Sequence, residues 1–182
     1  MRYPEYANIN GVRYKLRTDF RIALRCLEVV EDDSICDEER AMAVIYLLFG
    51  CIPADASLEE CLEKAKLFLQ CGKTTEEQKE VEKDMDFAAD MGYISASFAS
   101  DYQIDLSTAK MHWWRFCELI GGLTESSSLS RVRELRNYDL SDVSDPKARA
   151  KIIKAKEAVA LPQRMSAEER AAIEEFEKMW GG

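Results

Sequence analysis

The chain has 182 residues, of which 47% are hydrophobic and 32% charged, and its formal net charge is -9. This length is typical of one domain with room for a small appendage. An acidic chain binds phosphate backbones poorly, because such binding depends on lysine and arginine, so we expect no nucleic-acid partner. The charge is also uneven, since residues 31–105 are strongly acidic and residues 145–164 are basic.

We recognise neither a membrane-spanning segment nor a secretion signal in the sequence. The longest apolar stretch runs from Ala41 to Ile52 and is shorter than the roughly 18 residues of a membrane span. The first 16 residues lack the apolar centre of a signal peptide. The six cysteines form no CxxC pair, which favours reduced thiols in a cytosolic setting.

The N-terminal residues predict a β-hairpin. Asn10-Gly11 is the dipeptide that favours a type I′ turn, because both residues tolerate positive φ angles. Val12, Tyr14 and Leu16 then alternate with charged residues, as in a strand with one buried face.

The rest of the chain has helical patterns. Thr18 or Asp19 is expected to cap a first helix that extends to about residue 30. Residues 37–49 form a second helix, apolar nearly all round and therefore expected to be central, with Gly50 as its stop. A capping box of Ser57 and Glu60 opens a third helix that ends at Gly72.

Further helices are predicted after residue 74. One runs from about residue 75 to about 103, and the next from a cap at Ser107 to the stop at residues 121–122. Residues 130–138 form a short helix, and a polar linker follows. Asp145-Pro146 opens a basic helix to about residue 159, and a capping box at residues 166–169 opens a last helix to Trp180.

These elements predict an all-α fold, a compact helical bundle with a short N-terminal β-hairpin and a C-terminal helical arm. We place the body in residues 1–140 and the arm in residues 141–182. The apolar face of the last helix, which includes Phe176 and Trp180, is too short to be stable alone. It is therefore expected to dock on its own body or on a neighbouring subunit.

No cluster of residues indicates catalysis or a metal. His112 is the single histidine, which excludes the common multi-histidine metal sites, and no nucleotide-binding or metalloprotease motif is present. Asp86, Asp90 and Asp101 share one face of the predicted fourth helix. We interpret them as a solvent-exposed face, because a cation site needs more converging oxygens. No catalytic residue, metal site or cofactor is therefore predicted, and the chain is not expected to be an enzyme.

The stretch "IDLSTAKMHWWRFCELIGGL", residues 104–123, carries two adjacent tryptophans. At 100° per residue, Trp113, Phe116 and Ile120 share one apolar sector and are expected in the core. Trp114 points about 100° away, with Met111 three residues before it. Two interpretations stay open for this pair: Trp114 packs under another helix, or it is a partner-facing anchor of the kind that tryptophan often provides.

This stretch resembles the signature of the bacteriophage "gene product fifteen" family of tailed phages and prophages of Gram-positive bacteria. Similar segments are "DFR" at residues 19–21, "DFAADMGYISASF" at residues 86–98 and "LSRVRELRNYDL" at residues 129–140. The resemblance covers roughly residues 11–159 and brings no catalytic residue.

The resemblance implies a role similar to that of phage tail assembly chaperones in the host cytoplasm. Such a protein binds the tape measure protein, and with it the tail tube protein, and self-associates. The partner-binding residues are then expected to be Trp114, Met111, Phe176 and Trp180. The alternative is a structural tail or connector component that is retained in the virion.

Overall fold

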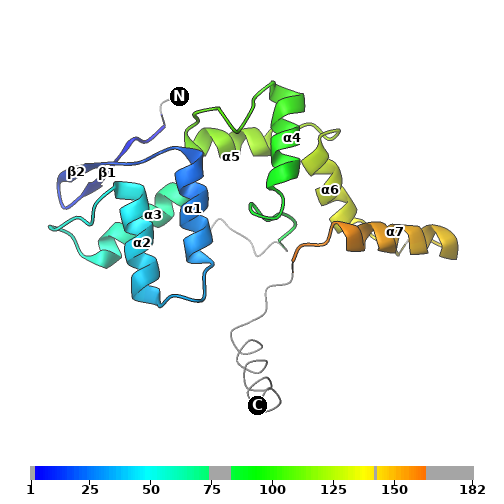
Figure 1. Cartoon of the computed structure of the whole chain (residues 1–182), viewed down its shortest axis with the longest axis horizontal. Helices are drawn as coiled ribbons and strands as arrows, with labels where there is room; N and C mark the ends of the chain where they lie inside the picture. The colour runs from blue at the N-terminus through cyan, green and yellow to red at the C-terminus, as the bar shows by residue number, and fades with distance from the viewer. Residues whose placement is uncertain (1–2, 74–82, 142, 163–182) are drawn as a thin grey trace, which may run out of the picture.

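The computed structural model describes residues 3–73, 83–141 and 143–162. In these residues the chain is mostly helical with one two-stranded sheet, so the predicted helical fold with an N-terminal hairpin is confirmed (Figure 1). The elements in chain order are β1 (Tyr6–Ile9), β2 (Val12–Lys15), α1 (Phe20–Val30), α2 (Asp37–Phe49), α3 (Leu58–Leu69), α4 (Met91–Tyr102), α5 (Trp113–Gly121), α6 (Ser128–Asn137) and α7 (Pro146–Ala158).

The hairpin forms as its turn residues predict. β1 and β2 are antiparallel, and Ile9 pairs with Val12 across the turn. Asn10 and Gly11 have φ angles of 50° and 80°, which is the double positive φ of a type I′ turn. Ile9 is buried, so the hairpin is anchored to the core and not only to itself.

Local signals also set the helix ends. The Asp19 carboxylate accepts a hydrogen bond from the Arg21 backbone N–H, and Ser57 and Glu60 form the predicted capping box. Gly50 follows α2 with a φ of 77°, the left-handed conformation in which glycine carries no steric penalty. Asp145 caps α7, whose first residue is proline.

Helix α2 is not the buried centre that its composition predicts. It packs on α1 and α3, and Val44, Ile45 and Leu48 are buried there. Its other side is open, with Met42 38% and Tyr46 55% exposed. The prediction of a central helix was therefore wrong, because apolar residues on this helix also face solvent.

Helix α4 begins later than predicted. Residues 83–86 have no regular secondary structure and residues 87–90 form a turn, and the part of the predicted helix at residues 74–82 lies outside the described residues. The Asp86 carboxylate accepts hydrogen bonds from the backbone N–H groups of Ala88 and Ala89, at 2.9 Å each. An aspartate bonded to the backbone just after it competes with helix formation, so a single helix from residue 75 was a wrong prediction.

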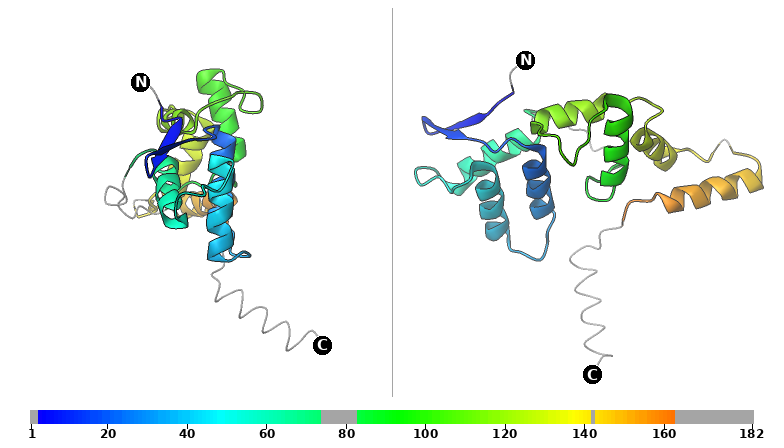
Figure 2. Two further views of the ribbon diagram at one scale, coloured as in Figure 1. Left: turned by 90° about the vertical axis from the view of Figure 1, so that its left-hand side faces the viewer. Right: turned by 45° about the horizontal axis from the view of Figure 1, so that its top comes forward.

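Helix α5 joins the two halves of the molecule. Figure 1 shows α5 between α1 on one side and α4 on the other, and the tilted view of Figure 2 agrees. β1, β2, α1, α2 and α3 lie on one side of this junction. On the other side α4 and α6 pack together, and the buried Ser97 hydroxyl accepts a hydrogen bond from the Leu129 backbone N–H at 2.9 Å.

Helix α7 lies at the far end of the long axis from α2 and α3 (Figure 1). It has no buried residue. Its contacts are polar: Lys156 Nζ donates to the Tyr138 carbonyl at 2.7 Å, and Arg149 donates to the Leu140 carbonyl at 3.1 Å. The boundary between body and arm near residue 141 stays a prediction, and the predicted last helix lies outside the described residues.

Candidate functional site

The two adjacent tryptophans both bind the C-terminal end of α3. Trp113 Nε1 donates to the Leu69 carbonyl at 2.9 Å, and Trp114 Nε1 donates to the Phe68 carbonyl at 2.8 Å. The last carbonyls of a helix have no partner within the helix. The indole pair supplies two such partners and thereby fastens α5 to α3.

His112 is the N-cap of α5, and not Ser107 as the sequence predicted. His112 Nδ1 accepts a hydrogen bond from the Trp114 backbone N–H at 3.1 Å, and Nε2 lies 3.0 Å from the Pro4 carbonyl oxygen. With Nδ1 as acceptor, the proton of the neutral ring is on Nε2 and is donated to Pro4. Both ring nitrogens therefore hold the backbone in place.

The residues before His112 are held against α1, which prevents an earlier start of α5. The Phe20 N–H donates to the Met111 carbonyl at 2.9 Å, and the Trp113 N–H donates to the Thr18 carbonyl at 2.8 Å. Arg21 reaches across to the Leu106 carbonyl at 2.6 Å. The "DFR" segment and the tryptophan segment thus contact each other directly.

Phe116 is the centre of an aromatic cluster. Its ring centroid lies 4.6 Å from that of Phe20, 5.2 Å from Phe98, 5.7 Å from Trp113 and 6.3 Å from Phe87. Trp113 and Phe116 are buried in the core, and Ile120 is partly buried against it. This cluster joins α1, α4 and α5 through side chains alone.

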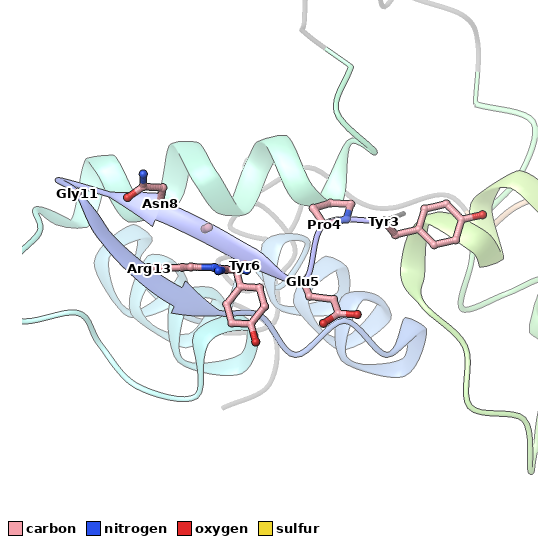
Figure 3. A pocket seen from close by; sticks show the side chains of 8 residues that line it. Tyr3, Pro4, Glu5, Tyr6, Asn8, Gly11 and Arg13 are labelled. Carbon is pink, nitrogen blue, oxygen red and sulfur yellow. The ribbon is translucent and has the colours of Figure 1, made fainter. Parts of the chain in front are cut away.

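A hollow of about 620 Å³ lies beside the N-terminal segment and the hairpin (Figure 3). Its charged lining residues are Glu5 and Arg13. The Arg13 guanidinium lies 3.8 Å from the centre of the Tyr6 ring, in a cation–π contact. Among the described residues of the lining, the cation is therefore engaged with an aromatic ring, and no nucleophile is paired with a base.

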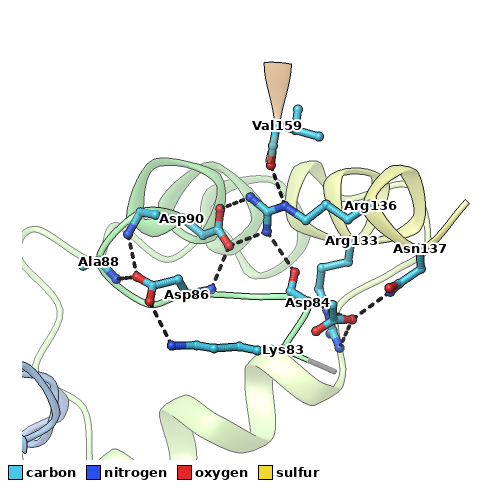
Figure 4. A network of polar contacts seen from close by, with 10 residues as sticks. Lys83, Asp84, Asp86, Ala88, Asp90, Arg133, Arg136, Asn137 and Val159 are labelled. Atoms are coloured by element: carbon cyan, nitrogen blue, oxygen red, sulfur yellow. Dashed lines mark hydrogen bonds and ion pairs between the residues drawn. The ribbon is translucent and has the colours of Figure 1, made fainter. Parts of the chain in front are cut away.

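A polar network fastens residues 83–90 to α6 (Figure 4). The two terminal nitrogens of Arg136 bind the two carboxylate oxygens of Asp90, at 2.7 Å each. Arg136 also donates to the Asp84 carbonyl at 2.9 Å and to the Val159 carbonyl at 2.6 Å. One guanidinium therefore joins α4, α6, the turn before α4 and the end of α7.

A second arginine adds to this network. Arg133 Nε and Asn137 Nδ2 donate to one carboxylate oxygen of Asp84, at 3.0 and 3.1 Å. Asp86 and Asp90 are 6% and 1% exposed, so the predicted solvent-exposed face was wrong for both. Asp101 instead accepts hydrogen bonds from Thr124. The sequence prediction failed because the partners of Asp86 and Asp90 come from distant or non-helical segments.

An apolar groove lies between α1 and the turn segment before α4. It encloses about 460 Å³ and is lined mainly by partly buried apolar side chains. Two methionines are among them, and methionine adapts its shape to different partners. Charged side chains stand at its edge. The apolar lining residues are Leu24, Leu27, Met85, Phe87, Ala88 and Met91, and the charged ones are Glu28, Glu31, Lys83 and Asp86.

A family model described as "Bacteriophage Gp15 protein" matches residues 3–161. The chain belongs to the bacteriophage Gp15 protein family. The resemblance predicted from the tryptophan segment is therefore confirmed. No curated protein matches the chain, and no solved structure matches it.

The Gp15-family match covers every residue of the apolar groove beside α1, of the polar network around Arg136, and of the contact between the two tryptophans and α3. The segments that suggested the family also meet in space. Arg136, from residues 129–140, binds Asp90, from residues 86–98, and Arg21 binds the segment that leads to the tryptophans. In this Gp15-family chain the recognisable segments are those that hold the two halves together.

The predicted partner-binding residues do not form one surface in the described part of the chain. Trp114 is partly exposed and lines a shallow hollow of about 340 Å³ with Leu67 and Tyr6. Met111 is partly buried against the core. Phe176 and Trp180 lie outside the described residues. The groove between α1 and residues 83–91 is not visible in the sequence, because its two sides are about 60 residues apart and no local pattern joins them.

Across residues 3–73, 83–141 and 143–162, no group of three or more metal-ligating side chains is placed to hold a metal ion. No helix within those ranges is long and apolar enough to cross a membrane. The six cysteines are free thiols.

Proposed function

We propose that this phage protein is a tail assembly chaperone that binds the tape measure protein, and secondarily the tail tube protein, in the host cytoplasm. It acts by protein–protein contacts without catalysis. The observation that carries the proposal is the apolar groove between α1 and residues 83–91, together with membership of the Gp15 family. A partner helix binds such a groove through apolar residues spaced along one face.

The chemistry of the groove suits a long, helical partner with apolar faces. Leu24 and Leu27 form one wall, and Met85, Phe87 and Met91 form the other. These side chains are partly buried, so they are held in place and still accessible. The acidic surface around the groove keeps the complex soluble while apolar faces of the partner are covered.

The test is a pull-down of the co-encoded tape measure protein with the groove made polar. Met85→Gln/Met91→Gln replaces two thioethers by amides of similar size, so the fold is retained. We expect the retained tape measure protein to fall at least about tenfold, or about 1.4 kcal/mol of binding free energy. Met42→Gln, on the exposed side of α2, is the matched control and should bind normally.

If both variants retained the tape measure protein equally, the groove would not be its binding site. If the parent chain retained none, the chaperone function would be contradicted. The alternative is a structural tail or connector component. Mass spectrometry of purified virions separates the two. A chaperone is present in lysates and absent from mature particles, whereas a structural component is present in particles at a fixed copy number.

A further inference from the structure

A second groove lies between α2 and α3, away from the α1 groove. It encloses about 370 Å³, and its apolar lining residues are Ala41, Leu58 and Leu62. Leu58 is 39% exposed, so the apolar surface is open to a partner. This groove can accept one or two apolar side chains of moderate size.

The edge of this groove is acidic. Glu38 lies on the α2 side, and Glu59 and Glu63 lie one helical turn apart on the α3 side. Within the described chain, none of these three carboxylates is in an ion pair or a side-chain hydrogen bond. Asp37, which pairs with Arg40, and Lys66 complete the edge. A partner for this groove therefore needs an apolar centre with positive charges beside it.

Helix α7 has that combination on its open side. Ile153 is 38% exposed, and Ala150 precedes it by three residues on the same side. Lys147 and Lys154 lie three residues before and four residues after Ala150, so they share this side with one acidic residue, Glu157, and both are exposed. Their ammonium groups make no ion pair with any described residue. No residue of α7 is buried within its own chain. This helix lies in residues 145–164, the basic part of the sequence.

The two surfaces belong to opposite ends of the molecule. Figures 1 and 2 place α2 and α3 at one end of the long axis and α7 at the other, with α5 and α4 between them. The bond from Arg136 to the Val159 carbonyl keeps the end of α7 beside α6. A contact between α7 and the α2–α3 groove of the same chain would require that end to leave its place.

We propose that α7 of one copy binds in the groove between α2 and α3 of a second copy. Ile153 fills the apolar floor, and Lys147 and Lys154 stand opposite Glu59 and Glu63. The two surfaces differ, so the contact is heterologous: the first copy keeps a free groove, and the second keeps a free α7. Contacts of this kind build rings or open filaments. The inference goes beyond tape measure binding, because it concerns copies of this chain alone and a different groove.

Sedimentation velocity of the full chain tests the contact, over a concentration series that extends into the millimolar range. We expect assemblies larger than one copy at about 0.1 M salt and weaker association at about 1 M, where the Debye length falls from about 10 Å to about 3 Å. Lys147→Glu/Lys154→Glu and Glu59→Lys/Glu63→Lys each place like charges across the contact. Each should weaken association at least about tenfold, or about 1.4 kcal/mol.

The decisive sample is an equal mixture of these two variants. Opposite charges then face each other at every junction, so assemblies should form again. Glu125→Lys/Glu134→Lys makes the same charge change on exposed residues in α6 and in the turn before it, which do not line the α2–α3 groove. Alone it should assemble as the parent chain does, because its α7 and its groove are unchanged.

Four results would overturn the proposal: a parent chain that stays a single copy, variants that assemble normally, a mixture that fails to assemble, or a control variant that loses association. All substituted side chains are exposed, so circular dichroism and melting curves should match those of the parent. If a variant failed to fold, Ile153→Gln, which removes the apolar contact at an exposed position, would replace it.

Discussion

Arg136 and Asp90 form a two-pronged ion pair in which the arginine side chain is 10% and the aspartate side chain 1% exposed. The carboxylate holds the pKa of the Arg136 guanidinium above its usual range, mainly through these hydrogen bonds. The pair lies 46 residues apart in sequence and joins α4 to α6. Removal of one partner leaves the other charged and buried.

We therefore expect Asp90→Ala to lower the free energy of unfolding by about 3–5 kcal/mol. Arg136→Met should have a similar effect. The double variant Asp90→Ala/Arg136→Met should lose less than the sum of the two, because no unpaired charge remains. Urea denaturation of the four proteins measures this. Additive losses would show that the two side chains stabilise the fold independently.

Asp86 gives the fold a dependence on pH. Burial raises its pKa, but hydrogen bonds from Ala89 and Ala88 and the Lys83 ammonium outweigh burial and lower the pKa to about 2. A carboxyl group with a lowered pKa stabilises the fold above the unfolded value of about 3.9, and this contribution is lost as pH falls through about 2. The stabilisation is about 2–3 kcal/mol.

Denaturation of the parent chain and Asp86→Asn at several pH values checks this prediction. The parent should lose stability between about pH 5 and about pH 2, and the variant should lose about 2–3 kcal/mol less over that interval. Parallel curves for the two proteins would mean that other carboxyl groups cause the acid sensitivity.

Trp113 and Trp114 are expected to contribute unequally to the free energy of unfolding. Trp113→Ala should lower the free energy of unfolding by about 3–5 kcal/mol, because a large side chain is removed from the core. Trp114 is partly exposed, so Trp114→Ala should cost about 0.5–1.5 kcal/mol for the lost hydrogen bond to the Phe68 carbonyl, which keeps the Cys71 N–H as a partner. Thermal and chemical denaturation measure both. Equal losses would place Trp114 in the core as fully as Trp113.

Two glycines provide a matched pair. Gly72 has a φ of 79°, and a Cβ atom there would lie 3.0 Å from Cη2 of Trp114. Gly72→Ala should therefore destabilise the fold by about 1–2 kcal/mol. At Gly92, in α4, a Cβ would meet nothing within 4 Å, so Gly92→Ala should be neutral or stabilise by up to about 1 kcal/mol. A neutral Gly72→Ala would show that the end of α3 can shift away from the indole.

Sequence patterns predicted the features that neighbouring residues determine. The Asn10-Gly11 turn, the Ser57–Glu60 capping box and the proline at the start of α7 depend on residues within four positions of one another. Their outcomes followed the pattern because no distant segment competes with them.

Features that depend on distant contacts were missed. Asp86 and Asp90 have the spacing of a solvent-exposed face. Only the fold reveals that Arg136 covers and binds Asp90. His112 caps α5 because Met111 and Trp113 are bonded to the start of α1, which no local pattern contains. The available signal was the three arginines of residues 131–136 beside a single acidic residue, because an arginine that becomes buried needs an acidic partner from another segment.

The indole bonds to the carbonyls of Phe68 and Leu69 also give the molecule an optical probe of its own. Trp113 and Trp114 lie where the N-terminal half of the described chain meets α5, so their fluorescence depends on whether α3 and α5 remain together. The third tryptophan, Trp180, would add a background signal that Trp180→Phe removes. In that variant, a red shift of the emission would report separation of α3 from α5 directly, without any attached dye.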